Sequence, residues 1–128
     1  MNRLTEEEKR VIVDKGTERP FSGEYDRFFK DGTFVCRQCN EPLFSSKSKF
    51  DAGCGWPAFD QNFPDAVTRL PDPDGSRVEI QCSNCSGHLG HVFTGEKMTE
   101  KDTRHCVNSL AIKFVPAGEK LPRVFPRN

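Results

Sequence analysis

The feature that most constrains this chain is the arrangement of its six cysteines. Four of them form two C-x-x-C pairs, Cys36–Cys39 and Cys82–Cys85, whereas Cys54 and Cys106 stand alone. Each pair follows a short run of strand-forming residues, which is how the knuckle of a zinc ribbon presents two thiolates to one metal ion. Because two such knuckles can converge on one ion, we predict a structural Zn²⁺, one per chain, held by Cys36, Cys39, Cys82 and Cys85.

The alternative for these four residues is a pair of redox-active dithiols. In thioredoxin-like motifs the C-x-x-C pair opens a helix, which lowers the thiol pKa. Neither pair here opens a helical pattern, so the sequence favours the metal. A site closed by four thiolates leaves no open position on the ion, and we expect this zinc to hold the fold without taking part in catalysis.

Length and charge limit the classes of protein to which the chain can belong. Its 128 residues are enough for one domain, and its 19 basic and 19 acidic side chains cancel, which disfavours a nucleic-acid binder. The charged N-terminus has no apolar core of a signal peptide, and no stretch approaches 18 apolar residues. We therefore expect no membrane association, a cytoplasmic location and, since no heptad or apolar stripe is present, a monomer.

The pattern of polar and apolar residues predicts a mostly-β domain with one short N-terminal helix. Thr5 and Glu8 have the form of a capping box, and Gly16 is a stop signal, so we predict a helix over 6–15. The remaining elements are strands joined by turn-rich stretches. The predicted strands cover 33–35, 42–44, 77–80 and 110–114, with a turn over 71–75.

The domain therefore divides into three parts. Residues 1–16 are the helix and its lead-in, 17–115 the β core that carries the chemistry, and 116–128 an irregular tail that contains three prolines.

The two unpaired cysteines and the histidines are candidates for chemistry. Arg104, two residues before Cys106, favours its thiolate, and the glycines on both sides of Cys54 suggest a mobile, exposed thiol. His88 and His91 fall in a predicted loop after the second knuckle. Purely structural roles are also open to these residues, because a lone cysteine is often a small buried apolar residue and a histidine pair often lies on the surface.

Four motifs resemble those of the type B methionine sulfoxide reductases and occur in the same order. They are Gly16-Thr17-Glu18-Arg19-Pro20-Phe21-Ser22-Gly23, Gly53-Cys54-Gly55-Trp56-Pro57, His88-Leu89-Gly90-His91-Val92-Phe93 and Arg104-His105-Cys106-Val107-Asn108-Ser109. The C-x-x-C pairs lie where that family places its zinc, and the resemblance runs from about Gly16 to Phe114. It implies two antiparallel sheets in a β-tent, reduction of the R epimer of methionine S-oxide, free or in an oxidised protein, and thioredoxin as reductant in protein repair under oxidative stress.

The resemblance also implies a role for single residues. Cys106 matches the nucleophile and Cys54 the resolving cysteine. Trp56 and Phe93 match substrate-binding positions, and the other catalytic matches are His88, His91, Arg104 and Asn108. The chain departs from the family at His105, where Tyr or Phe is common, and at Ser86-Gly87, which replaces a usual acidic residue.

These matches imply a mechanism that is chemically consistent. A sulfoxide sulfur is electrophilic only when its oxygen is protonated or strongly hydrogen-bonded, so the site needs a thiolate and an acid together. Cys106 would attack sulfur, with His91 as the first choice of acid and His88 assisting, and Cys54 would convert the resulting sulfenic acid into a Cys54–Cys106 disulfide. Two rival functions are a non-catalytic β-tent binding module and a zinc-ribbon nucleic-acid binder.

Overall fold

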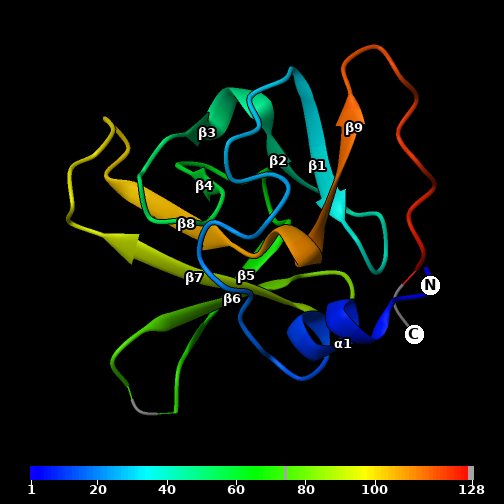
Figure 1. The fold of residues 1–128 in the computed structure, drawn as a ribbon, viewed down its shortest axis with the longest axis horizontal. Coiled ribbons are helices and arrows are strands. Elements are labelled where there is room, and N and C mark those ends of the chain that lie inside the picture. The colour runs from blue at the N-terminus through cyan, green and yellow to red at the C-terminus, as the bar shows by residue number, and fades with distance from the viewer. Residues whose placement is uncertain (74, 127–128) are drawn as a thin grey trace.

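A computed structural model describes residues 1–73 and 75–126 of the chain (Figure 1). In chain order the strands alternate with turns after a single N-terminal helix. The elements are α1 (Glu6–Ile12), β1 (Gly32–Cys36), β2 (Pro42–Ser45), the 3₁₀ turn η1 (Ser46–Ser48), β3 (Lys49–Phe50), β4 (Ala58–Phe59), β5 (Val67–Pro71), β6 (Val78–Cys82), β7 (His88–Thr94), β8 (Thr103–Val107), the 3₁₀ turn η2 (Ser109–Ala111) and β9 (Ile112–Pro116).

The strands form two sheets in which the neighbouring strands are antiparallel. One sheet has three strands in the order β2-β1-β9, and the other has six in the order β3-β4-β8-β7-β6-β5. Figure 1 shows the small sheet standing over one end of the large one, with α1 at the lower edge. The prediction of a mostly-β fold with two antiparallel sheets and one short helix is confirmed.

The helix is shorter than its sequence pattern predicted. Its start has the predicted capping box, in which the Thr5 hydroxyl accepts from the Glu8 amide and the Glu8 carboxylate accepts from the Thr5 amide. It ends at Ile12, not at residue 15, because Lys15 has a left-handed φ of 59° and the Gly16 amide turns back to the Arg10 carbonyl. Gly16 was correctly predicted to follow the end of the helix, but residues 13–15 before it lie outside the helix.

Three of the four predicted strands correspond to β1, β2 and β6, but the C-terminal one was misplaced. Residues 109–111 form η2, in which the Ala111 amide donates to the Asn108 carbonyl, so β9 starts only at Ile112. The prediction that His88 and His91 lie in a loop was wrong, since both belong to β7. Cys106 lies within β8, a strand that the sequence analysis did not predict.

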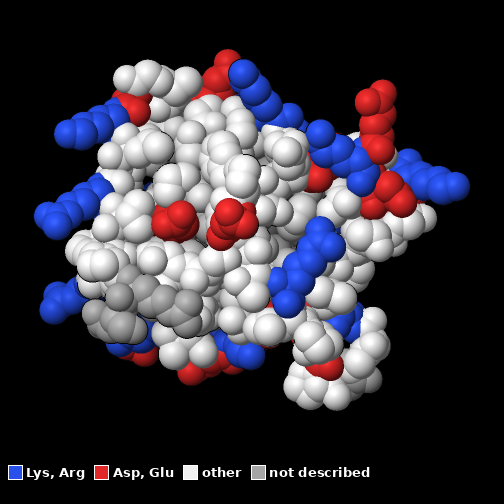
Figure 2. Space-filling view, turned by 180° about the vertical axis from the view of Figure 1, so that it is seen from behind, with Lys and Arg blue, Asp and Glu red and all other residues white. Residues whose placement is uncertain are grey.

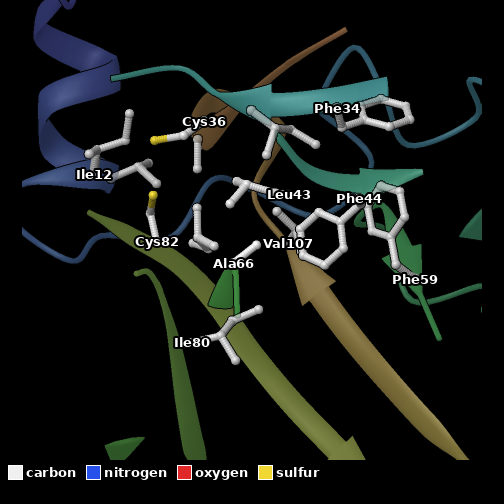
Figure 3. Packing of buried hydrophobic residues seen from close by; sticks show 14 of the residues in the cluster. Ile12, Phe34, Cys36, Leu43, Phe44, Phe59, Ala66, Ile80, Cys82 and Val107 are labelled. Atoms are coloured by element: carbon white, nitrogen blue, oxygen red, sulfur yellow. The ribbon is translucent and has the colours of Figure 1, made fainter. Parts of the chain in front are cut away.

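Aromatic side chains join the two sheets into one core. Phe34 and Phe44 of the small sheet meet Phe59 of the large sheet, with ring centroids 5.2 Å and 4.4 Å away. All three rings are fully buried, as are Leu43 and Ile80 (Figure 3). Burial of several such side chains at about 1.5–3 kcal/mol each provides most of the driving force that holds the sheets together.

The core continues into the cysteine cluster. In Figure 3 the sulfur atoms of Cys36 and Cys82 lie beside Ile12, which α1 inserts from the edge of the sheets. The helix packs closely here because residue 87 is glycine: a Cβ at that position would lie 2.8 Å from the Ile12 side chain. The helix therefore covers the second knuckle with an apolar side chain.

The C-terminal segment beyond Pro116, the last residue of β9, has no helix or strand in its described part, 117–126. It nevertheless makes specific contacts, since the Phe125 amide donates to the Cys39 carbonyl and the Asn84 side chain donates to the Phe125 carbonyl. Residues 127–128 of that tail, and residue 74 of the predicted turn over 71–75, lie outside the described residues.

The surface carries charges of both signs. On the face seen in Figure 2, Lys and Arg side chains project mainly around the rim, with Asp and Glu side chains between them and near the middle.

Within the described part of the chain, no helix has the length and apolar character needed to cross a membrane.

Candidate active site

Most of the sequence-predicted site residues line a single pocket of about 190 Å³. They come from three segments of the chain, 54–56, 91–93 and 104–108. The pocket contains Cys54, Trp56, His91, Phe93, Arg104, Cys106 and Asn108. Three further lining residues were not singled out from the sequence, namely Thr17, Arg77 and Gly90.

The pairing of β7 with β8 brings the central residues together. His91 lies opposite Cys106 and Phe93 lies opposite Arg104 in the antiparallel register. All four side chains contribute to the wall of the pocket, so this register assembles its centre from two adjacent strands. Cys106 is also paired with Ala58 of β4 on its other side, so the loop before β4 delivers Cys54 to the same pocket.

Gly90 allows the two strands to approach closely at this point. A Cβ at position 90 would collide with the carbonyl oxygen of Cys106. Any larger residue would push β7 away from β8 at the position of the Cys106 backbone. The glycine between the two histidines is thus a requirement of the backbone contact, a role that the sequence pattern did not disclose.

The thiols of Cys54 and Cys106 act on each other. A hydrogen bond from Cys106 lowers the pKa of Cys54 to about 6, against the opposing effect of burial and with support from the Arg104 guanidinium. The same interaction, together with burial, raises the pKa of Cys106, and Arg104 opposes this rise. Near neutral pH the pair therefore carries one negative charge and shares one proton between two sulfurs.

The guanidinium beside this pair is held in place from two directions. Arg104 donates to both carboxylate oxygens of Glu96, at 2.8 and 3.1 Å, and lies 4.4 Å above the centre of the Phe93 ring. A bidentate pair combined with ring stacking leaves the group little freedom. The positive charge is consequently preorganised to stabilise a thiolate on either cysteine.

His91 is bonded to a carboxylate that the sequence analysis missed. Its Nε2 lies 3.2 Å from Asp72 Oδ2, and Arg77 Nε lies 3.3 Å from the same oxygen. Burial, followed by the charge of Arg77, lowers the pKa of His91, so the ring is neutral at pH 7. With its Nε2–H donated to Asp72, the ring has Nδ1 free to take up and release a proton. Asp72 lies in the turn segment after β5, where no sequence signal marked it.

His88 lies behind His91 instead of in the pocket wall. It lines a neighbouring pocket of about 350 Å³, and the two rings are 5.7 Å apart in an edge-on arrangement. The buried Glu79 carboxylate accepts from its Nδ1 at 2.7 Å and from Lys15 Nζ at 3.2 Å. Burial alone would raise the pKa of Glu79, but its hydrogen bonds with His88, Gln81 and Lys15 lower it.

The side chains of Asn108 and Trp56 both form hydrogen bonds with the backbone of Glu18. The Asn108 side chain accepts from the Glu18 amide and donates to the Leu89 carbonyl, both at 3.0 Å. The indole Nε1 of Trp56 donates to the Glu18 carbonyl, also at 3.0 Å. Both polar groups of the Asn108 amide are therefore used by backbone, and the residue locks the edge of the pocket.

His105 takes the place of an aromatic residue in the core. It is 1% exposed, its ring lies 5.7 Å from that of Phe44, and its Nδ1 is 2.9 Å from the Phe59 carbonyl oxygen. Burial lowers its pKa, so the ring is neutral and Nδ1–H donates to that carbonyl. The imidazole packs among the same phenylalanines that a larger ring would meet.

The four cysteines of the C-x-x-C pairs form a possible metal-binding site. Their sulfur atoms all lie within 4.8 Å of one another. Two close contacts cross between the knuckles: Cys36 to Cys85 and Cys39 to Cys82, each 3.6 Å. Each of these contacts joins one cysteine of the first pair to one of the second. This is the arrangement expected if both pairs bind the same ion.

Comparison with known proteins agrees with this arrangement. The family model of the SelR domain matches residues 4–116. Peptide methionine sulfoxide reductase B3, chloroplastic, of Oryza sativa subsp. japonica is 55% identical over 117 residues, which cover 91% of this chain and 51% of that protein. The chain thus spans about half the length of this relative.

Shorter relatives match over most of their own length. Peptide methionine sulfoxide reductase B5 of Oryza sativa subsp. japonica is 56% identical over 116 residues, or 90% of this chain and 85% of that protein. Peptide methionine sulfoxide reductase B5 of Arabidopsis thaliana is 56% identical over 115 residues, which are 89% and 83% of the two chains.

The shared proton of the thiol pair can be tested through alkylation. We expect the rate at which iodoacetamide modifies Cys54 to rise with pH through an inflection near 6, because the thiolate forms as pH passes the lowered pKa. In Cys106→Ala the hydrogen bond is lost, so the inflection should move up toward the ordinary thiol value of about 8.5. Mass spectrometry of the Cys54 peptide measures both rates. An inflection at the same pH in both proteins would contradict the assigned cause.

Proposed function

The chain belongs to the SelR domain family, and from this we propose that it reduces methionine sulfoxide, as the R epimer, to methionine. The observation that carries the proposal is the pair of thiols, Cys54 and Cys106, in a pocket that also holds a fixed guanidinium and a partly buried histidine. One thiol is needed to attack the sulfoxide and the second to remove the product from the first.

The first step is attack by the Cys106 thiolate on the sulfoxide sulfur. Transfer of the shared proton to Cys54 leaves the charge on Cys106, where Arg104 stabilises it. The sulfoxide oxygen takes up a proton as it passes from the substrate to the Cys106 sulfur, methionine leaves, and that sulfur is oxidised by two electrons to a sulfenic acid. His91 is the proposed acid. Its neutral ring carries a proton on Nε2, which Asp72 holds, so Nδ1 first takes up a proton from solvent and then passes it to this oxygen.

The second step closes a disulfide. Cys54, which holds the proton it received in the first step, gives that proton to the departing oxygen as its sulfur attacks the Cys106 sulfur. The S–O bond breaks, the S–S bond forms and the oxygen leaves as water. The placement of both cysteines in the wall of one pocket supports this step. Thioredoxin is the proposed dithiol reductant that restores both thiols.

We propose that the pocket selects one epimer because one of its sides is apolar and the other is polar. Trp56 and Phe93 offer apolar surface to the S-methyl group, and the indole is held by its bond to the Glu18 carbonyl. His91 and Arg104 offer polar groups to the oxygen. With the methyl and oxygen placed and Cys106 as the attacking atom, only one of the two epimers can direct its remaining carbon chain out of the pocket.

The proposed metal is one structural Zn²⁺ bound by Cys36, Cys39, Cys82 and Cys85. Four sulfurs at about 2.3 Å from a tetrahedral ion lie about 3.8 Å from one another, close to the observed cross-knuckle separations of 3.6 Å. Four converging thiolates argue against two independent redox dithiols, which would lie apart. The ion would stabilise the fold, and no step of the reaction passes through it.

The substrates proposed are free methionine sulfoxide and oxidised residues within proteins, so the biological role would be repair of oxidative damage. Reduced thiols and a thioredoxin partner fit a reducing compartment such as the cytoplasm. We also propose that the chain acts as a monomer and as a single domain.

An epimer assay tests the function itself. With dithiothreitol as reductant, we expect steady consumption of the R epimer of N-acetylmethionine sulfoxide and none of the S epimer, measured by chromatography of the methionine product. A protein that consumes neither epimer would be a binding module, and one that consumes the S epimer would refute the assignment of the pocket walls.

The two cysteines should fail in different ways when replaced. Cys106→Ser should release no methionine, because a serine hydroxyl stays protonated near pH 7. Cys54→Ser should release about one methionine per enzyme and then stop as a sulfenic acid that a dimedone-type reagent traps, with partial rescue by dithiothreitol. The wild type should show a Cys54–Cys106 disulfide by mass spectrometry after one turnover. Normal thioredoxin-driven turnover by Cys54→Ser would remove this residue from the mechanism.

Replacing one knuckle cysteine should release the metal. We expect Cys82→Ser to contain no zinc by elemental analysis and to melt at lower temperature, since the metal contributes on the order of several kcal/mol to folding. Cys54→Ser is the matched control, because it removes one thiol outside the cluster and should keep both zinc and stability. A zinc-free wild type, or a Cys82→Ser variant of unchanged stability, would refute the metal site.

A further inference from the structure

The segment 19–22 forms a tight turn in which an apolar side chain occupies an unfavourable backbone conformation. The Ser22 amide donates to the Arg19 carbonyl at 3.2 Å, Pro20 is the second residue, and Phe21 is the third with a φ of 65°. This is the pattern of a type II turn, whose third position is normally glycine. Seven described non-glycine residues have positive φ, and among these only Phe21 has an apolar side chain.

The strain at this position is not offset by burial of the ring. Phe21 is 61% exposed. The ring is also absent from the described lining of the catalytic pocket and of the pocket beside Glu18. A bulky residue that keeps a strained conformation without packing inside the protein points to a use outside it.

The turn is attached to the loop that carries Cys54. The Phe21 amide donates to the Gly55 carbonyl at 2.7 Å, and a Cβ at Gly55 would lie only 2.6 Å from Pro20 Cβ. On the other side of Cys54, a Cβ at Gly53 would meet nothing within 4 Å among the described residues, so the surface there is open. The Phe21 ring is therefore exposed on a turn bonded to the residue that follows Cys54, within reach of a molecule that approaches this thiol from outside.

We infer that the turn formed by Arg19–Ser22 is a docking element for the protein dithiol that reduces the Cys54–Cys106 disulfide. This inference rests on the proposed function, which supplies the disulfide. Of the two sulfurs, that of Cys54 is the less buried and is the one an external thiolate can attack. Aromatic side chains are enriched among the residues that contribute most to the affinity of protein interfaces.

The exchange that the docked partner performs is balanced in two steps. The thiolate of the partner attacks the Cys54 sulfur, the bond to Cys106 breaks, and Cys106 leaves as a thiolate beside Arg104. The second thiol of the partner then attacks the mixed disulfide, which frees the Cys54 thiolate. The partner is oxidised by two electrons to a disulfide, and both cysteines are reduced.

The test compares two reductants in variants at position 21. In Phe21→Ala and Phe21→Gly we expect turnover with dithiothreitol to be unchanged and kcat/KM for thioredoxin to fall about tenfold, the loss of one aromatic anchor. Phe21→Gly should not lower the melting temperature, because glycine suits a positive φ. Val13→Ala is the control, since Val13 is similarly exposed at 59% but lies at the end of α1.

The remaining outcomes each have a definite meaning. Thioredoxin-driven turnover that stays at the wild-type level in both variants would overturn the docking role alone. A higher KM for a sulfoxide peptide, but not for free methionine sulfoxide, with dithiothreitol as reductant would assign the ring to the substrate polypeptide and also overturn it. A wild type that is inactive with dithiothreitol would overturn the proposed function, and the inference with it.

Discussion

The close backbone contact between β7 and β8 is the interaction on which the candidate site depends. It sets His91 opposite Cys106 and Phe93 opposite Arg104, and it is possible only because residue 90 has no Cβ. The pairing of these two strands therefore places a thiol, an imidazole and a guanidinium in one pocket, and no loop is needed to position them. Cys54 and Trp56 reach this pocket from a loop, and that loop is anchored by β4, which pairs with β8.

The cysteine cluster and the pocket are mechanically connected through the same sheet. Cys82 ends β6 and His88 begins β7, so the second knuckle is the turn that joins two neighbouring strands of the site. An ion that ties this knuckle to Cys36 and Cys39 would fix the small sheet against the large one. A structural zinc can in this way matter for activity while it remains outside the chemistry.

Several predicted residues act through partners that lie elsewhere in the chain. Arg104 is oriented by Glu96, and His91 is bonded to Asp72. Asn108 uses its whole amide to hold Glu18 and Leu89, so its place in the pocket reflects support of the backbone more than contact with substrate. The charges at the site are thus preorganised, which is the condition for effective electrostatic stabilisation.

The sequence by itself predicted which four cysteines form the cluster and which two thiols are candidates for chemistry. It also predicted the mostly-β class and the capped helix, because all of these depend on short-range patterns. The sequence by itself could not place Asp72 beside His91, show that Gly90 sets the strand contact, or separate His88 from the pocket, because these follow from strand register. The local pattern also placed η2 inside a strand and two histidines in a loop, since tertiary pairing overrides local propensity. Cys54 and Cys106 are 52 positions apart, and only the fold, by pairing β4 with β8, places both in one pocket.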